Sequence, residues 1–139
     1  MLNQLLKDMY NQNIQIELKN SNKLNLIYEQ GMLTIKLKET IIQYKKQMIQ
    51  RLKENAAAQE KGFLVYEFGM FYEYRFGLGA FLFIERNPNG SASSWRANYA
   101  VNENKPYKVK YLKKNVPFED AYREAANFVD WLRKKRRAG

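Results

Sequence analysis

The carboxylates and cations are the side chains of this chain with most capacity for chemistry, because its 139 residues include no His and no Cys. Imidazole and thiolate supply most metal sites, general bases and nucleophiles in proteins. The glutamates at 67, 73 and 85 remain for acid–base or hard-cation chemistry, but isolated Glu on strands is usually solvated or salt-bridged. Gly77-Leu78-Gly79 lacks the further Gly and the Lys of a phosphate-binding loop. We therefore expect no enzyme, with no catalytic residue, no metal site and no cofactor.

Positive charge is the second chemically informative feature. The net charge is +10, and residues 105–139 carry eleven Lys or Arg against four Asp or Glu. Residues 1–60 carry nine against six, so the excess lies toward the C-terminus. A basic region of this kind is typical of proteins that bind phosphate-rich or acidic partners. The alternative is a basic tail that serves only solubility.

The cations fall into two candidate sets for binding nucleic acid. On strands expected over 95–101 and 107–112, alternation places polar residues opposite a face of aromatic and apolar residues. The second set is an uninterrupted basic run at the end of a helix. The alternatives are a solvated sheet face and a helix end whose cations favour the helix dipole. The candidate residues are Arg96, Asn98, Lys108, Lys110, Lys113, Lys114, Arg133, Lys134, Lys135, Arg136 and Arg137.

Aromatic residues are dense between Phe63 and Phe83. Such rings stack on bases in proteins that bind single strands. Packing within the core of a sheet is the alternative, and the sequence favours it for most of these rings. We expect Trp95 and Trp131 to be packing anchors.

The elements that must position these residues fall into two parts. The hydrophobic fraction of 45% is sufficient for a core. In residues 1–55, apolar spacing predicts a helix from Leu2 that ends near Asn11–Asn13, where Asn tolerates a left-handed cap. Alternation then predicts a hairpin over 14–27, and Thr34 is a suitable N-cap for a helix that reaches Leu52. Residues 56–62 are expected to form a linker with helical character.

The stretch LLKDMYNQNIQIELKNSNKLNLIYEQGMLTIKLKETIIQYKKQMIQRLKEN resembles the N-terminal docking domain of the TubC type, found on nonribosomal peptide synthetase subunits. It has the leading Leu5–Leu6, Asn13 at the turn that usually holds Gly, and the pair Leu33–Thr34. Ile35–Lys36 stands where the family usually has Pro-Glu. The resemblance implies that the hairpin accepts a short acidic segment of a partner. The contacts it implies are Gln15, Glu17, Lys19, Lys23 and Asn25.

Residues 63–139 are predicted to form an antiparallel sheet and one long helix. Strands are expected over 63–68, 70–76 and 80–85 as well as the two described above, with a strong turn signal at Asn87-Pro88-Asn89-Gly90. Pro117, an acidic first turn and an apolar stripe predict the C-terminal helix. The segment from Phe81 to Arg133, with the tail KVKYLKKNVPFEDAYREAANFV, loosely resembles the arm-site-binding domains of phage integrases and the plant-type AP2 fold. This resemblance implies a three-stranded sheet whose outer face contacts DNA.

The predicted fold is therefore α+β, with a helix–hairpin–helix module followed by an antiparallel sheet packed on one C-terminal helix. The predicted function is a small non-catalytic protein of a bacterium or mobile element that binds nucleic acid, with DNA as the expected kind. Its N-terminal module docks a protein or self-associates as a homodimer. The alternative is an adaptor or inhibitor that binds an acidic protein surface. Without Cys, a signal peptide or a clean apolar span, we expect a cytoplasmic protein with no membrane partner.

Overall fold

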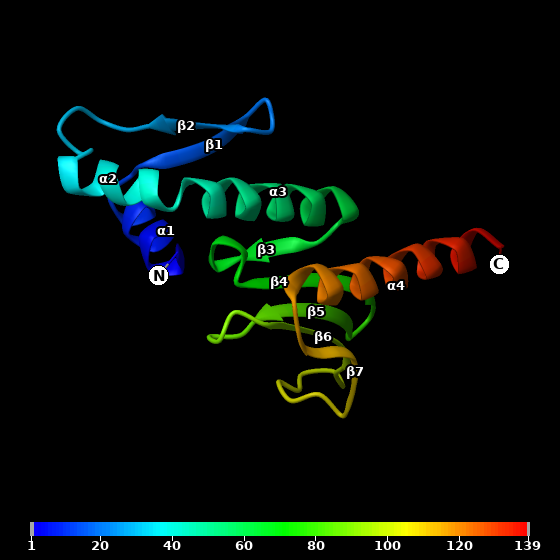
Figure 1. Cartoon of the computed structure of the whole chain (residues 1–139). Coiled ribbons are helices and arrows are strands. Elements are labelled where there is room, and N and C mark those ends of the chain that lie inside the picture. The colour runs from blue at the N-terminus through cyan, green and yellow to red at the C-terminus, as the bar shows by residue number, and fades with distance from the viewer. Residues whose placement is uncertain (1, 139) are drawn as a thin grey trace. The chain divides into compact units, whose positions relative to one another are not determined.

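The computed structural model describes residues 2–138 and confirms the predicted α+β fold. The described chain contains four α-helices and two antiparallel sheets (Figure 1). It divides into two compact units, of which the first ends at Ala57 and the second begins at Ala58. This boundary falls in the predicted linker over 56–62, which is helical as far as Lys61, the last residue of α3 (Lys45–Lys61).

The N-terminal unit has the predicted helix–hairpin–helix order. Its first elements are α1 (Leu2–Asn11), β1 (Gln15–Lys19) and β2 (Lys23–Ile27). The apolar residues of α1 at helical spacing, Leu5, Leu6 and Met9, are buried. The chain leaves α1 through Asn13, whose φ of 57° is the left-handed conformation expected there.

The long helix expected from Thr34 begins where predicted but is interrupted. Thr34 Oγ1 accepts a hydrogen bond of 3.1 Å from the backbone N–H of Leu37, which caps α2 (Ile35–Gln43). The helix then ends at Tyr44 (φ −100°, ψ 10°), and α3 follows as a separate helix. The prediction of one continuous helix is therefore wrong at this point, which contains neither Gly nor Pro, the usual signals of a break.

The C-terminal unit is built on a five-stranded antiparallel sheet, two strands larger than the integrase and AP2 resemblance implies. Neighbours along the chain are neighbours in the sheet (Figure 1). A short 3-10 helix, η1 (Glu67–Gly69), separates the first two strands. The strands are β3 (Leu64–Tyr66), β4 (Phe71–Gly77), β5 (Ala80–Arg86), β6 (Ala92–Asn98) and β7 (Lys108–Val116).

One face of this sheet packs on α4 (Phe118–Ala138). The helix begins after Pro117, whose carbonyl accepts from the N–H groups of Asp120 and Ala121. Its predicted apolar stripe is confirmed, since Ala121, Ala125 and Val129 are completely buried. They share one hydrophobic core with the buried sheet residues Tyr72, Leu82, Ile84 and Ala92. Ala58 and Phe63, at the end of α3 and just beyond it, join the same core.

Gly79 locks the β4–β5 turn against the backbone that leaves β6. Its carbonyl accepts a 2.8 Å hydrogen bond from the N–H of Tyr99, and its φ is +71°. A Cβ at this position would lie 2.4 Å from the Tyr99 carbonyl oxygen. Gly90, in the β5–β6 turn, also has a positive φ of +91°, but no atom lies within 4 Å of the place that its Cβ would take. Only Gly79 of these two therefore combines conformational strain with a backbone clash.

Gly79→Ala is expected to destabilise the C-terminal unit by roughly 3 kcal/mol, because the methyl group adds a clash to the cost of a left-handed conformation. Gly90→Ala carries only the conformational cost and should lose roughly 1 kcal/mol. Urea unfolding followed by tryptophan fluorescence reports on this unit, which contains both tryptophans. Equal losses for the two variants would contradict the role assigned to the Tyr99 contact.

Candidate nucleic-acid interface

The two faces of the five-stranded sheet differ in chemistry. In register, Leu82 pairs with Arg96 and Arg96 pairs with Lys110. These residues lie on the α4 side, because Leu82 is part of the core beneath that helix. The neighbouring positions Phe83, Trp95 and Tyr111 also pair in register, and alternation directs them to the opposite face. The sequence-predicted separation of basic from aromatic positions on β6 and β7 is therefore confirmed.

The sequence predicted that Arg96 lies on the uncovered side of the sheet. This prediction is wrong, because Arg96 packs under α4. Its guanidinium carbon is 4.5 Å from the ring centroid of Phe128 and 5.8 Å from that of Phe76. Its Nε is buried without a hydrogen-bond partner in the described part of the chain. Alternation correctly predicted which residues share a face of the sheet with Arg96. The sequence does not reveal which face the helix covers, because β4 and β5 carry large apolar residues on both faces.

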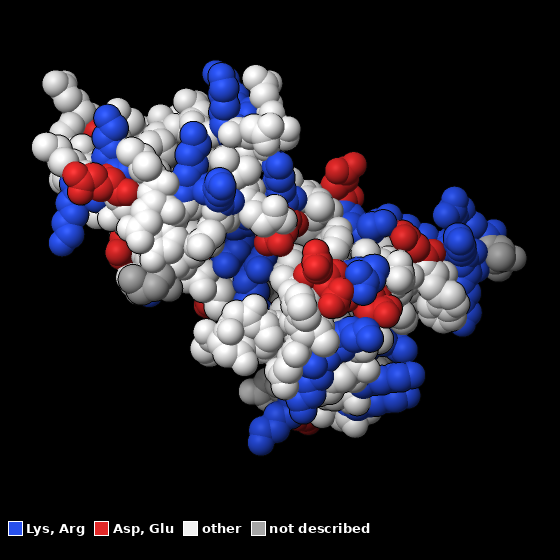
Figure 2. All heavy atoms as spheres, viewed as in Figure 1, with Lys and Arg blue, Asp and Glu red and all other residues white. Residues whose placement is uncertain are grey.

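The lysines of β7 are the most accessible of the predicted strand candidates. Lys108, Lys110 and Lys114 are exposed, whereas Lys113 and Asn98 are half-buried. Asn98 pairs with Lys108 at the end of the sheet, so both share the α4 side with Lys110. Figure 2 shows Lys and Arg side chains gathered over β7 and along the C-terminal part of α4. β7 contains four lysines and no acidic residue.

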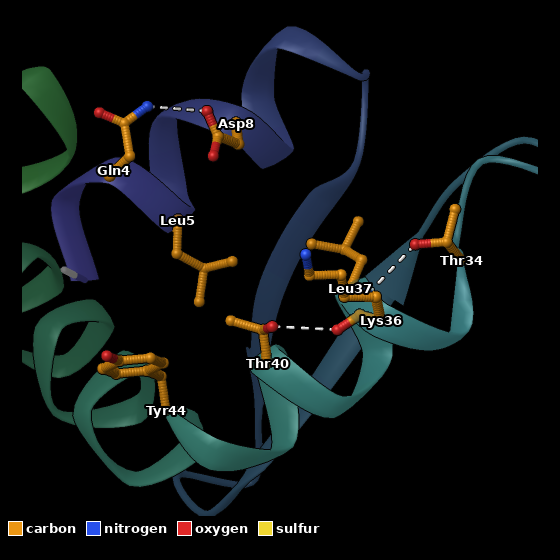
Figure 3. Close-up of a pocket in the computed structure, with 8 residues that line it drawn as sticks. All are labelled: Gln4, Leu5, Asp8, Thr34, Lys36, Leu37, Thr40 and Tyr44. Carbon is orange, nitrogen blue, oxygen red and sulfur yellow. Dashed lines mark hydrogen bonds between the residues drawn. The ribbon is translucent and has the colours of Figure 1, made fainter.

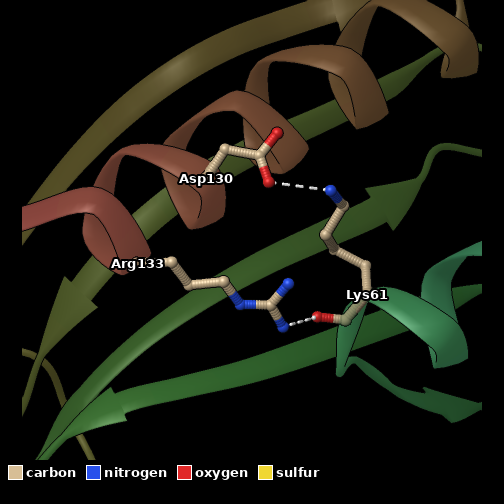
Figure 4. Close-up of polar contacts among 3 residues, drawn as sticks. All are labelled: Lys61, Asp130 and Arg133. Carbon is tan, nitrogen blue, oxygen red and sulfur yellow. Dashed lines mark hydrogen bonds and ion pairs between the residues drawn. The ribbon is translucent and has the colours of Figure 1, made fainter. Parts of the chain in front are cut away.

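The basic run at the end of α4 is partly used in holding the helix. Arg133 Nη2 donates to the Lys61 carbonyl at 2.8 Å (Figure 4), and Arg136 Nη2 donates to the Phe76 carbonyl at 2.6 Å. The Lys135 ammonium lies 4.9 Å from the ring centroid of Trp131. All five side chains of the run remain exposed. The cations predicted to contact phosphates are thus present at the surface, but two of them also anchor the helix.

An ion pair adds a second contact between α4 and the end of α3. Lys61 Nζ donates to Asp130 Oδ1 at 2.8 Å, beside the Arg133 hydrogen bond (Figure 4). This hydrogen bond, together with the positive charge of Lys61 and of the neighbouring Arg133, lowers the pKa of Asp130. The carboxylate therefore offsets part of the positive charge at the base of the basic run.

Seven aromatic residues occupy the face of the sheet opposite α4, and we name this surface the aromatic face. Ring centroids of adjacent strands are 5.2 Å apart for Phe71 and Phe83, 5.5 Å for Phe83 and Trp95, and 5.7 Å for Trp95 and Tyr111. The contacts form an unbroken row of rings across β4, β5, β6 and β7. The full set is Tyr66, Phe71, Phe81, Phe83, Trp95, Tyr99 and Tyr111.

Charged side chains of both signs lie among these rings. The Arg75 guanidinium is 4.9 Å from the centroid of Phe81, and the Lys114 ammonium is 5.0 Å from that of Tyr111. Glu73 and Glu85 belong to the same face, since they pair with Phe83 and Phe71. Local desolvation and the nearby Glu73, which accepts a 3.4 Å hydrogen bond from the Tyr66 hydroxyl, raise the pKa of Tyr66.

The predicted aromatic cluster between Phe63 and Phe83 thus divides between two locations. Phe63 and Tyr72 are buried in the core, and Tyr74 and Phe76 pack against it. Phe71, Phe81 and Phe83 point to the other side, where they join Trp95 and Tyr111 from the next strands. This surface was not predicted from the sequence, although the common odd parity of these positions is a signal that aligning the strands in register would have revealed.

In the N-terminal unit, the hairpin residues implied by the docking-domain resemblance share one face. The register pairs Gln15 with Ile27, Glu17 with Asn25 and Lys19 with Lys23. The Asn25 amide donates to Glu17 Oε1 at 2.7 Å. Ile16, Leu18, Leu24 and Leu26 take the other face and are half-buried. The hairpin therefore presents all five implied docking residues together.

A shallow pocket of about 290 Å³ lies between α1 and α2 (Figure 3). Leu5, Leu37 and Tyr44 supply most of its apolar lining. Its polar groups hydrogen-bond within the protein: Gln4 donates to Asp8 at 2.8 Å, and the Thr40 hydroxyl donates to the Lys36 carbonyl at 2.9 Å. These hydrogen bonds engage Gln4, Asp8 and Thr40 within the protein, and most of the remaining lining is apolar.

Compared with protein-family models, curated proteins and solved structures, the chain matches none of them. The resemblances to docking domains and to DNA-binding domains therefore remain predictions. Among the described helices, none combines the length and apolar composition that a bilayer crossing requires.

Arg96→Ala is expected to lower the free energy of unfolding by roughly 1–2 kcal/mol, because it removes the cation that lies against two rings beneath α4. Lys108→Ala removes an exposed cation from the neighbouring strand and should change stability by less than about 0.5 kcal/mol. Thermal and urea unfolding of both variants provide the comparison. If the two variants were equally stable, Arg96 would not have the packing role described above.

Asp130→Asn is expected to lower thermal stability slightly at neutral pH. The pKa of Asp130 is lower in the folded protein than its ordinary value. Its carboxylate therefore stabilises the fold fully at a pH above the ordinary pKa, and this contribution is lost as the pH falls through the pKa of the folded state. The difference between Asp130→Asn and the parent protein should therefore shrink below about pH 4. Glu103→Gln, which removes an exposed carboxylate from the β6–β7 loop, is the control. A stability difference that stayed constant down to about pH 2 would contradict the ion-pair account.

Proposed function

We propose that this chain is a small, non-catalytic nucleic-acid-binding protein that acts in the cytoplasm and binds phosphates with β7 and the C-terminal end of α4. The observation that carries the proposal is that Lys108 and Lys110 are exposed on one side of β7, a strand without acidic residues, and that Lys114 is exposed on its other side. Cations that lie together on a rigid strand can neutralise successive phosphates and release their counterions. A sheet strand also fixes the spacing of these side chains better than a loop.

The end of α4 supplies the second part of the proposed surface. Arg133 and Arg136 fix the helix by donating to the carbonyls of Lys61 and Phe76. Lys134, Lys135 and Arg137 extend the positive charge over the following turn. In this proposal the two anchoring arginines hold the basic end in place, while the lysines and Arg137 contact phosphates. Arg96, which packs under α4, contributes charge at a distance instead of direct contact.

The proposal predicts salt-steep binding that depends on particular lysines. A Lys108→Ala/Lys110→Ala variant should weaken binding to a labelled duplex roughly tenfold near physiological salt. The slope of log affinity against log salt should fall by about 0.9 for each phosphate that the variant no longer neutralises. Fluorescence anisotropy between about 50 and 200 mM salt measures both quantities.

The matched control is Lys36→Ala/Lys38→Ala, which removes the same charge from α2. This control should leave the salt slope unchanged. Equal losses in both double variants would show that net charge, and not β7, governs binding. An absence of binding to duplex and single-stranded DNA at low salt would remove the proposal altogether.

The hairpin supports a second candidate function, the docking of an acidic protein segment or self-association. The supporting observation is that Lys19 and Lys23 pair directly and share a face with Gln15, Glu17 and Asn25. This candidate acts through the N-terminal unit and is compatible with nucleic-acid binding by the other unit. A molecular mass that stayed monomeric at all protein concentrations would argue against self-association.

A further inference from the structure

We propose that the aromatic face binds unpaired bases, so that the ligand of this protein is single-stranded nucleic acid. This inference rests on the proposed function, because the phosphates of that strand would lie along the basic β7. It adds a second surface, on the other side of the sheet, and a ligand class that the lysines alone do not define.

The aromatic face is the side of the sheet that the helical parts of its own unit leave uncovered. Both α4 and the last turn of α3, through Ala58, belong to the core on the opposite side. Tyr111 is 49% exposed and Tyr66, which contacts Phe71 from β3, is 41% exposed. Phe71 and Trp95 are half-buried, and Phe83 between them is only 8% exposed. A solvated sheet face usually alternates polar residues against the core. A contiguous aromatic surface in that position indicates a binding site.

The arrangement of the rings suits bases that are not paired. Four rings on four adjacent strands, Phe71, Phe83, Trp95 and Tyr111, lie 5.2–5.7 Å apart between neighbours. Unstacked bases can place their π-faces on such a platform, and every base has such a face. A duplex keeps these faces stacked inside the helix and presents only phosphates and groove edges. A broad row of rings therefore favours a single strand.

The charges on this face indicate where the phosphates would run. Lys114 lies over Tyr111 on β7, and Arg75 lies over Phe81. Glu73 and Glu85 lie on β4 and β5, where their carboxylates repel phosphates. The favoured path therefore places bases on the half-buried Trp95 and the exposed Tyr111, with the sugar–phosphate backbone toward β7. The lysines on the other side of that edge strand are then close enough to attract the same backbone.

The first test compares labelled oligothymidylate with a blunt duplex of the same length. The parent protein is expected to bind the oligothymidylate more tightly. Trp95→Leu and Tyr111→Leu keep apolar bulk but remove the stacking surface, and each should weaken single-strand binding roughly five- to hundred-fold without weakening duplex binding. Tyr111→Trp should restore or exceed parental affinity. The control is Tyr10→Leu, which replaces an exposed tyrosine of α1.

The second test uses the two tryptophans of the chain. In Trp131→Phe the remaining indole is Trp95, and addition of oligothymidylate should quench its fluorescence by stacking. In Trp95→Phe the remaining indole lies on α4, and quenching should be lost. Glu73→Gln and Glu85→Gln should each tighten single-strand binding about twofold or more by removing a repelling charge. This gain of affinity is decisive even if a leucine variant fails to fold.

The outcomes separate this inference from the proposed function. Equal, salt-steep binding of the oligothymidylate and the duplex, with all leucine and glutamine variants unchanged, would overturn the inference and leave the phosphate-binding proposal intact. Quenching of Trp131 alone would place the nucleic acid on α4 and also overturn it. Failure of both nucleic acids to bind at low salt would overturn both proposals. A purified acidic protein that bound through Trp95 and Tyr111, with duplex binding retained and no oligothymidylate binding, would overturn the inference alone.

Discussion

The packing of α4 against one face of the five-stranded sheet is the interaction on which the C-terminal unit depends. Three side chains of the helix, Ala121, Ala125 and Val129, are completely buried against Leu82 and Ile84. Small residues on the helix let its backbone approach the sheet closely, so larger side chains of the strands fill the space between them. Burying a Leu or Ile side chain contributes about 1.5–3 kcal/mol, so this contact contributes substantially to the stability of the unit.

This packing also assigns a role to each face of the sheet. Even-numbered positions of β4, β5 and β6 face the helix, which draws Arg96 beneath it and against Phe128. Odd-numbered positions are left on the other side, where Phe83 and Trp95 contact each other. A sheet with aromatic residues on both faces has two candidate cores, and the helix selects one. The other face is left partly exposed, with Phe83 buried and the rings around it half-buried or exposed, so its chemistry differs from that of an ordinary solvated face.

Most elements were predicted from the sequence because their signals are local, but the strand expected over 95–101 instead occupies Ala92–Asn98. The apolar stripe of α4 and the Thr34 cap are each visible within a few residues, and both are confirmed. The residue at which β7 ends was harder to predict from the sequence, because the polar run Lys113–Asn115 resembles a loop. The strand continues through it because register shifts near Ser94 and a left-handed Asn115 (φ 56°) accommodate extra residues.

The candidate site was harder to predict because its residues meet only in the folded sheet. Alternation gives the two sets of residues on a strand, but the choice of the buried set depends on contacts with distant α4. The anchoring of Arg133 by the Lys61 carbonyl likewise joins residues far apart in the sequence. A run of five basic residues therefore looked uniform in the sequence, although the folded chain uses its members differently.

One explanation for the lysines of β7 is that this strand lies at the edge of the sheet. Charged residues on an edge strand discourage pairing with another chain, and this alone explains Lys108 and Lys110. It does not explain Tyr111, because an exposed ring on the other side of the same strand adds apolar surface where association is most easily initiated. Lys114 over that ring combines a cation with a stacking surface at one point. The proposed single-stranded nucleic acid, which carries both negative charge and flat aromatic groups, would account for the two sides of β7 together.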